Sequence, residues 1–327
     1  MYSMKIFITK KIPSKGIEML RERGYDVTVN AYDRTLSKDE LITELSKGRY
    51  DAVLCLLTDA IDDAVLAAAG ETCKIFANYA VGFDNIDLKA ALARNILITN
   101  TPGVLTDTVA EHAFALLLAL AHRIPESDRF TKEGKYKGWE PMLLLGRDVS
   151  RKVLGIVGLG RIGSRVAYYA AKGFEMKILY YDVHRSEEFE KEYHAEFREN
   201  IDDLFSESDA ISIHVPLLPT THHLVNEARL KRMKPTALLI NTSRGPVIDE
   251  KALLQALENN VIRGAALDVF EYEPAITPGL EKLDNVILTP HTASATEETR
   301  QAMSECAAHN IIEALEGRNP PNLVKIK

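Results

Sequence analysis

Residues 152–182 constrain the fold of this chain most, because they have the pattern of one complete βαβ unit. An apolar run at 153–157 is typical of a buried strand, and apolar residues then recur at helical spacing. A second apolar run ends on Asp182, and the intervening turn contains Gly158, Gly160 and Gly163. We therefore predict a strand, a tight turn, a helix and a second parallel strand.

The spacing G-x-G-x-x-G in this unit points to a dinucleotide. Gly158 permits the tight turn, Gly160 lets the backbone approach a pyrophosphate, and Gly163 lets the helix pack closely on the strand. The glycine spacing alone also occurs in turns that bind nothing, but here the N-terminus of a helix follows and would face the anion. The sequence therefore predicts a nicotinamide dinucleotide site.

The acid at the end of the unit favours NADH over NADPH. Asp182 lies 19 residues beyond Gly163, where a carboxylate accepts hydrogen bonds from the adenosine ribose and repels a 2′-phosphate. His184 and Arg185 follow directly and could partly accommodate such a phosphate, so NADPH stays possible.

Composition excludes several other classes. The 327 residues suggest two domains, and the net charge of −7 gives no basic face for nucleic acid and argues against binding an anionic membrane surface. Cys55, Cys73 and Cys306 lack metal-ligand spacing, so we expect no metal. The longest apolar run, 113–121, is too short to span a bilayer, and the chain starts in a strand-like run without a signal peptide. We expect a cytoplasmic protein.

Residues 1–100 alternate between strand-like and helix-like stretches, which predicts a parallel sheet covered on both faces. We expect strands at 5–9, 25–29, 52–57, 74–78 and 96–100, and helices at 14–23, 37–47 with Gly48 as cap, 62–69 and 88–94. This half has no G-x-G-x-x-G pattern, so we expect it to hold something other than the dinucleotide.

The remainder of the chain continues the α/β pattern. A buried helix at 106–122 is followed by a polar segment at 126–146 containing the only tryptophan, Trp139, which is either structural or an anchor on another chain. Later elements are strands at 209–215, 237–241, 264–269 and 286–288, and helices at 250–258 and 296–316. We expect the last helix to return to the first half, giving domains 1–103 with 291–327, and 104–290.

Polar residues just past the strand ends are the candidates for chemistry, because open parallel sheets bind ligands there. Arg244 follows a buried strand and could hold a carboxylate through two parallel hydrogen bonds, or form a structural ion pair. His291 follows the last strand, and Glu273 lies between the two in sequence. If Glu273 pairs with His291, the protonated imidazolium is favoured, which is the acid needed when a carbonyl is reduced. Histidines in a polar loop or on a helix are discounted as catalytic candidates: His222, His223, His112 and His122.

With G-L-G-R-I-G, these three residues make the chain resemble the D-isomer-specific 2-hydroxyacid dehydrogenases over essentially its full length. NTSRGPVID, ALDVFEYEP and TPHTAS are similar to the three signature blocks of that family in order and spacing, and CLLTD, NYAVGFDNID, TPGVLTD and KGWEPMLLLG resemble its glyoxylate/hydroxypyruvate reductases. The resemblance implies an α/β fold of two Rossmann-like, doubly wound parallel-sheet domains with an interdomain cleft. The first is flavodoxin-like and binds substrate, the second binds NAD, and the protein is a homodimer.

The resemblance also implies a role for each site residue. Arg244 binds the carboxylate and carbonyl oxygen of the substrate, His291 is the general acid/base and Glu273 tunes it. On the substrate side it implies the backbone of Val81 and Gly82, a lining of Leu56 and Leu57, and Trp139 reaching into the pocket of the partner. On the cofactor side it implies Val109, Gly158, Gly160, Arg161, Ile162, Gly163, Asp182, Val215, Pro216, Thr221, Thr242, Asp268 and Ala293. Val109 replaces a usual Thr, and Thr292-Ala293 replaces Ile-Gly.

Several related activities are less consistent with the sequence. Formate dehydrogenases have Gln at the position of Glu273, phosphite dehydrogenases have Lys at that of Val81, and phosphoglycerate dehydrogenases have Arg at that of Asn78. We expect reduction of a small 2-oxo acid, glyoxylate or hydroxypyruvate first, with D-lactate- or D-3-phosphoglycerate-type activity as alternatives. A different class is an NAD-bound dimeric scaffold like the C-terminal-binding-protein corepressors, which keep the same three residues.

Overall fold

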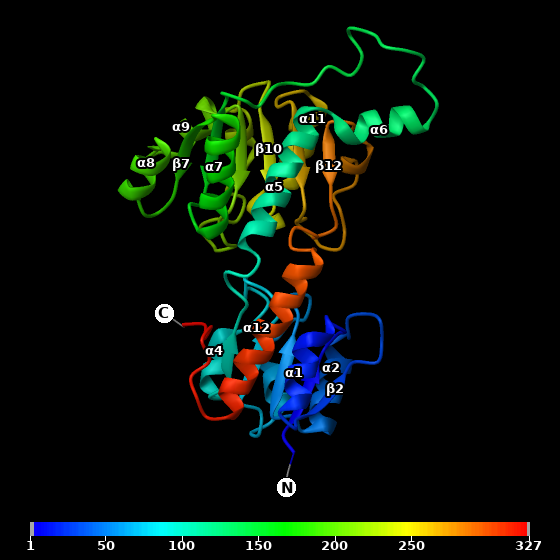
Figure 1. Cartoon of the computed structure of the whole chain (residues 1–327), viewed down its shortest axis with the longest axis vertical. Helices are drawn as coiled ribbons and strands as arrows, with labels where there is room; N and C mark the ends of the chain where they lie inside the picture. Colours follow the sequence, from blue (N-terminus) through cyan, green and yellow to red (C-terminus); the bar gives the residue numbers. More distant parts are fainter. Residues whose placement is uncertain (1–2, 326–327) are drawn as a thin grey trace. The chain divides into compact units, whose positions relative to one another are not determined.

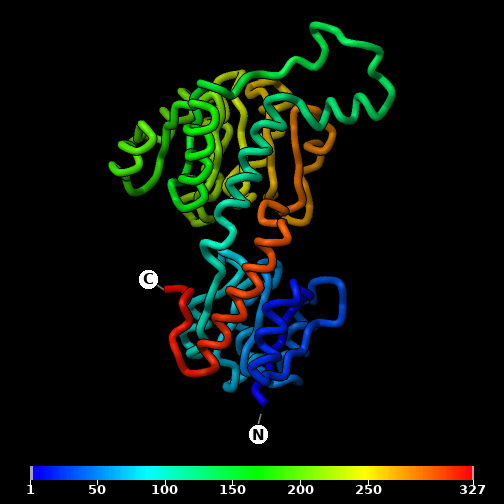
Figure 2. The backbone as a smooth tube through the Cα atoms, in the orientation of Figure 1, coloured from blue at the N-terminus to red at the C-terminus, as the bar shows by residue number. Residues whose placement is uncertain are grey.

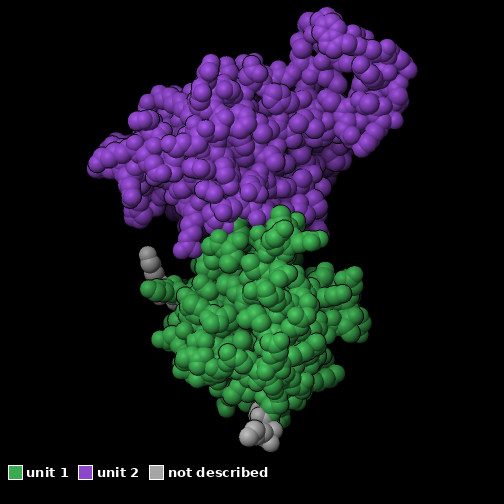
Figure 3. Space-filling view, viewed as in Figure 1, with its two compact units in different colours: residues 1–105, 295–327 green, residues 106–294 purple. Residues whose placement is uncertain are grey.

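The computed structural model describes residues 3–325 and divides into two compact units. Unit 1 comprises residues 1–105 and 295–327, and unit 2 comprises residues 106–294 (Figure 3). The trace in Figure 2 shows that the C-terminal helix lies in unit 1 beside the N-terminal elements.

Unit 1 is a five-stranded parallel sheet in the order β2-β1-β3-β4-β5 (Figure 1). Its strands are β1 (Lys5–Ile8), β2 (Asp26–Val29), β3 (Ala52–Cys55), β4 (Ile75–Asn78) and β5 (Leu97–Thr99). Its helices are α1 (Ser14–Glu22), α2 (Lys38–Gly48), α3 (Asp63–Ala69), α4 (Leu88–Ala93) and α12 (Glu297–Leu315). Helix α12 packs on α1 and on β3, β4 and β5, so the end of the chain completes this unit.

Local chemistry fixes the helix starts in unit 1. Ser37 and Glu40 form a reciprocal capping box on α2, and the Asp62 and Asp87 carboxylates cap α3 and α4. The far end of α2 differs from the prediction: Gly48 is its last helical residue, and Arg49 is the left-handed C-cap at φ 50°. Strand β3 ends at Cys55 rather than at Leu57, because the Leu56 N–H turns to the Asp59 carboxylate at 2.8 Å.

Unit 2 is a seven-stranded parallel sheet in the order β12-β11-β10-β9-β6-β7-β8. Its strands are β6 (Val153–Val157), β7 (Lys177–Tyr181), β8 (Glu196–Phe197), β9 (Ala210–Ile213), β10 (Leu238–Asn241), β11 (Gly264–Leu267) and β12 (Val286–Leu288). Its α-helices are α5 (Thr106–Ala121), α6 (Ile124–Lys132), α7 (Arg161–Phe174), α8 (Glu187–Tyr193), α9 (Ile201–Glu207), α10 (Glu227–Leu230) and α11 (Glu250–Glu258); η1 (Gly245–Val247) and η2 (Leu280–Lys282) are short 3-10 helices.

The core of unit 2 lies on both faces of its sheet. Neighbouring residues of β10 point to opposite faces: Leu239 packs in one apolar cluster with α9, α10 and α11, and Ile240 in another with α5 and α7. Helices α5 and α7 lie side by side on that second face (Figure 1). The predicted α/β class with two doubly wound parallel sheets is therefore confirmed.

Several features of unit 2 differ from the sequence expectation, and strand β8 and helices α8, α9 and α10 were not predicted. The segment expected to be a polar loop begins with helix α6, which buries no residue but starts with Pro125 at its N-terminus and carries Arg123–Glu126 and Asp128–Lys132 ion pairs. Residues 291–294 belong to unit 2, whereas the predicted boundary falls before His291. Within residues 3–325, the structure has no helix with the length and hydropathy of a membrane span.

Candidate active site

The glycine turn between β6 and α7 has the geometry that a dinucleotide requires. Gly158 has φ +95°, and a Cβ there would lie 2.8 Å from the His214 backbone. A Cβ on Gly163 would lie 2.1 Å from the Gly158 carbonyl oxygen, so the close approach of helix and strand needs glycine. Gly160 instead faces open space and caps α7 without a side-chain hydrogen bond, which leaves room and N–H donors for an anion.

Asp182, directly after β7, is held beside this turn. Its Oδ2 accepts a hydrogen bond from the Leu159 N–H at 2.6 Å, and its Oδ1 accepts one from the His184 N–H at 3.0 Å. The half-buried carboxylate is thereby fixed at the edge of the glycine turn, as expected for a group that binds a ribose diol.

The strand order in the sheet of unit 2 reverses next to β6. The chain runs from β6 to β7 and β8 on one side and returns to β9 on the other, which makes the β6–β9 junction the switch point where such sheets bind ligands. Thr242 follows β10 at this edge, and its buried Oγ1 has no hydrogen-bond partner within residues 3–325. A buried hydroxyl without a partner at a strand end fits a polar ligand. The glycine cradle, Asp182 and Thr242 together fit a nicotinamide dinucleotide.

The other predicted cofactor residues are distributed around this edge. Val215 and Pro216 follow β9, and the Thr221 Oγ1 donates to the Pro216 carbonyl at 2.6 Å and so holds their loop closed. Arg161 is exposed and Ile162 partly buried in the first turn of α7. Val109 is buried on α5.

Glu273 and His291 are in contact. The His291 Nδ1 lies 3.0 Å from the Glu273 Oε2, and the other carboxylate oxygen accepts the Phe270 N–H at 3.0 Å. Burial alone would raise the pKa of Glu273, but the hydrogen bond and charge of His291, the Phe270 N–H and the Arg244 charge outweigh it and lower the pKa. The carboxylate is therefore ionised at neutral pH.

Arg244 is close enough for its charge to act on Glu273. It follows β10 at the start of η1, where the fully buried Asn241 donates to its carbonyl at 2.9 Å. A Cβ on Gly245 would lie only 1.9 Å from the Phe270 backbone, so glycine is what lets the Arg244 turn pack against the segment that leads to Glu273. The structure thus brings the arginine, the carboxylate and the imidazole into one neighbourhood.

His291 sits on a strained turn held by Asp268. His291 has φ 53°, in the left-handed region, and its N–H donates to the Asp268 carbonyl at 2.9 Å. The fully buried Asp268 carboxylate accepts from the Thr289 hydroxyl at 2.6 Å and from the N–H groups of Thr292 and Ala293 at 2.8 Å each. Asp268 was predicted as a cofactor contact, and the structure shows it organising the turn that carries His291.

Electrostatics keep Asp268 charged despite its burial. Desolvation alone would raise the pKa of Asp268, but hydrogen bonds from His112, Thr289, Thr292 and Ala293 lower it. The His112 Nε2 lies 3.5 Å from Asp268 and 3.3 Å from the Thr289 Oγ1. Sequence reasoning discounts His112 because it lies on a helix, and only the fold places α5 beneath this turn.

Glu250 is a second buried carboxylate that the sequence analysis missed. It is 1% exposed and accepts from the Glu271 N–H at 2.7 Å and the Thr277 hydroxyl at 2.6 Å. It therefore anchors both ends of the loop that contains Glu273. Its position at the start of α11 looks like ordinary helix capping, so the sequence holds no separate signal for this role.

A further histidine at a strand end, His214, does not fit the role of proton donor. Its Nε2 lies 2.8 Å from the Ser212 Oγ, and desolvation lowers the pKa of His214 to about 3. The ring is therefore neutral at neutral pH.

In unit 1, the predicted substrate loops are joined by side-chain amides. The Asn85 Nδ2 donates to the carbonyls of Leu56 and Asp59 at 3.1 and 3.0 Å, and its Oδ1 accepts from the fully buried Asn78 at 3.2 Å. The Asn78 Nδ2 also donates to the Gly82 carbonyl at 2.8 Å. This network links the loop after β3, which includes Leu57, to the loop after β4.

The Val81 carbonyl is held as well, by the Asn100 Nδ2 at 2.7 Å. Because the Val81 C=O and the Gly82 N–H belong to one trans peptide, fixing the oxygen directs the N–H to the opposite side.

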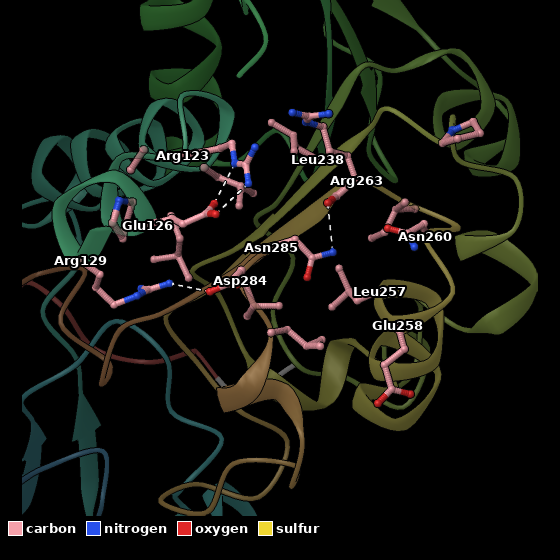
Figure 4. Close-up of a pocket in the computed structure, with 18 residues that line it drawn as sticks. Arg123, Glu126, Arg129, Leu238, Leu257, Glu258, Asn260, Arg263, Asp284 and Asn285 are labelled. Carbon is pink, nitrogen blue, oxygen red and sulfur yellow. Dashed lines mark hydrogen bonds and ion pairs between the residues drawn. The ribbon is translucent and has the colours of Figure 1, made fainter. Parts of the chain in front are cut away.

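A cavity of about 430 Å³ lies elsewhere in unit 2, near the amino ends of β10, β11 and β12. Arg123–Glu126 and Arg129–Asp284 ion pairs line it (Figure 4). It contains none of the predicted site residues.

Comparison with known proteins agrees with this geometry. The sequence profile described as D-isomer specific 2-hydroxyacid dehydrogenase, NAD binding domain, matches residues 114–293. A protein named glyoxylate reductase from Korarchaeum cryptofilum is 50% identical over 98% of this chain and 95% of its own length. The crystal structure of the TT0316 protein from Thermus thermophilus superposes with a TM-score of 0.92 at 40% identity, covering 98% of this chain and all of that one. A glyoxylate reductase from Paecilomyes thermophila superposes with a TM-score of 0.87 at 28% identity, covering 99% of each chain.

Proposed function

Because this chain belongs to the D-isomer-specific 2-hydroxyacid dehydrogenase family, we propose that it reduces glyoxylate or hydroxypyruvate with NADH. The observation that carries the proposal is the 3.0 Å contact between Glu273 and His291 within range of the Arg244 charge. The names of the relatives, glyoxylate reductases, support the choice of substrate.

The three side chains divide the work on the substrate. The Arg244 guanidinium binds the carboxylate and carbonyl oxygen of the 2-oxo acid, and its positive charge stabilises the oxygen as negative charge develops. The N–H groups of Val81 and Gly82 bind the carboxylate, and Leu56 and Leu57 line the substrate pocket.

His291 supplies the proton. With Nδ1 occupied by Glu273, the imidazolium donates from Nε2 to the carbonyl oxygen as it becomes an alkoxide, and in the reverse direction the neutral ring takes that proton back. The Glu273 carboxylate holds the ring in this orientation.

The dinucleotide, when bound, supplies or accepts the hydride. We assign its pyrophosphate to the N-terminus of α7 at Gly160, its adenosine ribose to Asp182 and its nicotinamide half to the strand ends that carry Thr242 and Ala293. The Asp182 carboxylate favours NADH, because it accepts hydrogen bonds from the ribose and repels a 2′-phosphate, with NADPH as the weaker cofactor.

Other substrates are less well supported. Asn78 is fully buried and engaged with Gly82 and Asn85, so a neutral amide stands where a substrate phosphate would need a cation. D-lactate-type chemistry on pyruvate requires only a methyl group in place of the hydroxymethyl group of hydroxypyruvate, and it is the second candidate.

We propose that the active form is a cytoplasmic homodimer. Residues 133–150 form no helix or strand (Figure 2), and Trp139 and Met142 within them are 82% and 75% exposed. Exposed large apolar side chains in such a segment favour burial against a second copy, with Trp139 reaching the partner's substrate site. The three free cysteines fit a reducing compartment.

A substrate panel tests the proposed activity. We expect NADH absorbance to fall with glyoxylate and hydroxypyruvate, more slowly with pyruvate, and more slowly with NADPH than with NADH. Tight NADH binding without turnover of any small 2-oxo acid would contradict the proposal and favour the scaffold function.

A further inference from the structure

We propose that Glu190 is a specificity-determining residue, which favours NADH by withholding Arg185 from the 2′-phosphate of NADPH. The inference rests on the proposed cofactor site at the glycine turn and Asp182. It concerns a pair of residues just beyond β7, which we call the Arg185–Glu190 clamp.

Arg185 lies where a phosphate-binding cation would be expected. It is the third residue after Asp182, and its side chain is 57% exposed. In dinucleotide-binding folds, an arginine near this acid is what accommodates a 2′-phosphate. The presence of Arg185 alone would therefore suggest that the chain accepts NADPH.

Glu190 occupies the donors of Arg185. The Arg185 Nε donates to the Glu190 Oε1 and the Arg185 Nη2 donates to the Oε2, both at 2.8 Å. This two-bond pairing is the geometry with which a guanidinium would otherwise hold phosphate oxygens. A 2′-phosphate must displace the Glu190 carboxylate before it can bind Arg185 in the same way.

The Glu190 side chain is itself held in place by a buried tyrosine. The hydroxyl of the fully buried Tyr180 donates to the Glu190 Oε1 at 2.8 Å. The same hydroxyl accepts a hydrogen bond at 2.9 Å from the N–H of Ser186, the N-cap residue of α8. The Glu190 side chain is 18% exposed and therefore more buried than that of its partner. The Arg185 guanidinium also lies 5.9 Å from the centre of the Phe197 ring, which holds it over β8.

The clamp stays charged at every pH at which the enzyme would work. The hydrogen bonds from Arg185 and Tyr180 lower the pKa of Glu190 to about 2. Two carboxylates, Asp182 and Glu190, therefore oppose a 2′-phosphate at this edge, and the guanidinium of the clamp is already neutralised. The adenosine ribose of NADH is bound by Asp182, so the clamp should not affect the affinity for NADH.

The test measures ligand binding without turnover. Isothermal titration calorimetry would compare ADP-ribose with 2′-phospho-ADP-ribose on the full-length chain and on Glu190→Gln, which keeps an oxygen acceptor for Tyr180. Glu188→Gln is the matched control, because Glu188 is an exposed residue of the same helix and the substitution changes the net charge equally. All measurements are repeated in an Asp182→Ala background, where repulsion by that carboxylate is removed.

We expect Glu190→Gln to lower the Kd of 2′-phospho-ADP-ribose by about five-fold, the scale of an exposed two-bond ion pair, and to leave that of ADP-ribose within about two-fold. The gain should disappear in Arg185→Gln/Glu190→Gln and be absent in Glu188→Gln. An unchanged Kd in the Asp182→Ala background, or a gain that survives loss of Arg185, would overturn the clamp while leaving the NADH proposal standing. Failure of the unmodified chain to bind ADP-ribose would instead overturn the cofactor proposal, and the clamp with it.

Discussion

Asp268→Asn should show that a buried carboxylate holds the turn of His291, the proposed general acid/base, in place. The substitution keeps the size of the side chain but replaces one oxygen with an NH₂ group. If Oδ1 keeps Thr289 and Thr292, the new amide faces the Ala293 N–H, which is buried. One hydrogen bond to a charged acceptor is then lost, a donor is left without a partner, and the remaining bonds weaken because the acceptor is neutral.

The magnitude follows from these contacts. A hydrogen bond to a charged group contributes about 1.5–3 kcal/mol, so the combined loss of free energy of unfolding should be about 2–4 kcal/mol. In a unit of this size that lowers Tm by about 5–15 °C. Because His291 is held in the left-handed region by this turn, its displacement should reduce kcat/KM by about 10²-fold, as expected for a misplaced catalytic group.

The pH dependence gives an independent check. The pKa of Asp268 is lowered in the folded state, so its stabilising contribution is fully present above the unfolded value of about 3.9 and is lost as pH falls through the lower folded value. The difference in Tm between the two proteins should therefore be constant from neutral pH down to about 5 and shrink in more acidic buffer.

Asp284→Asn is the control for this experiment. It makes the same chemical change at a side chain that is 75% exposed and paired with an exposed Arg129, where the effect should stay below about 1 kcal/mol. If Asp268→Asn unfolds at the temperature of the unmodified protein and retains kcat/KM within about two-fold, the assigned role of the carboxylate is refuted.

Four further outcomes are expected. Arg244→Ala should raise the KM for glyoxylate strongly, since the substrate loses a two-bond partner, and an unchanged KM removes Arg244 from that role. Glu273→Gln should lower kcat/KM for reduction, because the amide replaces the ionised carboxylate that holds the His291 Nδ1; an unchanged kcat/KM would contradict the pairing. Asp182→Ala should narrow the preference for NADH over NADPH, measured as a ratio of Kd values, and an unaltered ratio would mean that the ribose is bound elsewhere. Asn85→Ala should raise KM more than it lowers kcat, because it releases the Leu56 loop; a circular dichroism spectrum like that of the parent separates this from unfolding, and an unchanged KM would refute a positioning role.

The sequence predicted the helices and strands whose buried side chains produce a hydrophobic pattern. Strands such as β3 and β10 are fully buried in parallel sheets and therefore appear as continuous apolar runs. Helix α6 was missed because no residue in it is buried and its sequence is mostly polar; the proline in its first turn and two ion pairs support it instead. Strand ends were also overestimated, as at Leu57, because the acceptor that ends the strand, Asp59, lies further along the chain.

The candidate site likewise contains residues that the sequence indicates and residues that only the structure reveals. Arg244, Glu273 and His291 could be proposed from the sequence because each lies near a predicted strand end or in a recognisable motif. Asp268 and Glu250, the buried carboxylates that hold the loops of His291 and Glu273, could not be assigned these roles, since their partners are backbone N–H groups and hydroxyls that any sequence supplies. Asp268 directly follows β11 and Glu250 begins α11, and each accepts hydrogen bonds from donors that lie outside the strands. The geometry of the Glu273–His291 pair therefore depends on two carboxylates outside that pair, and a chain with the three motif residues but without these carboxylates should fold yet position its histidine poorly.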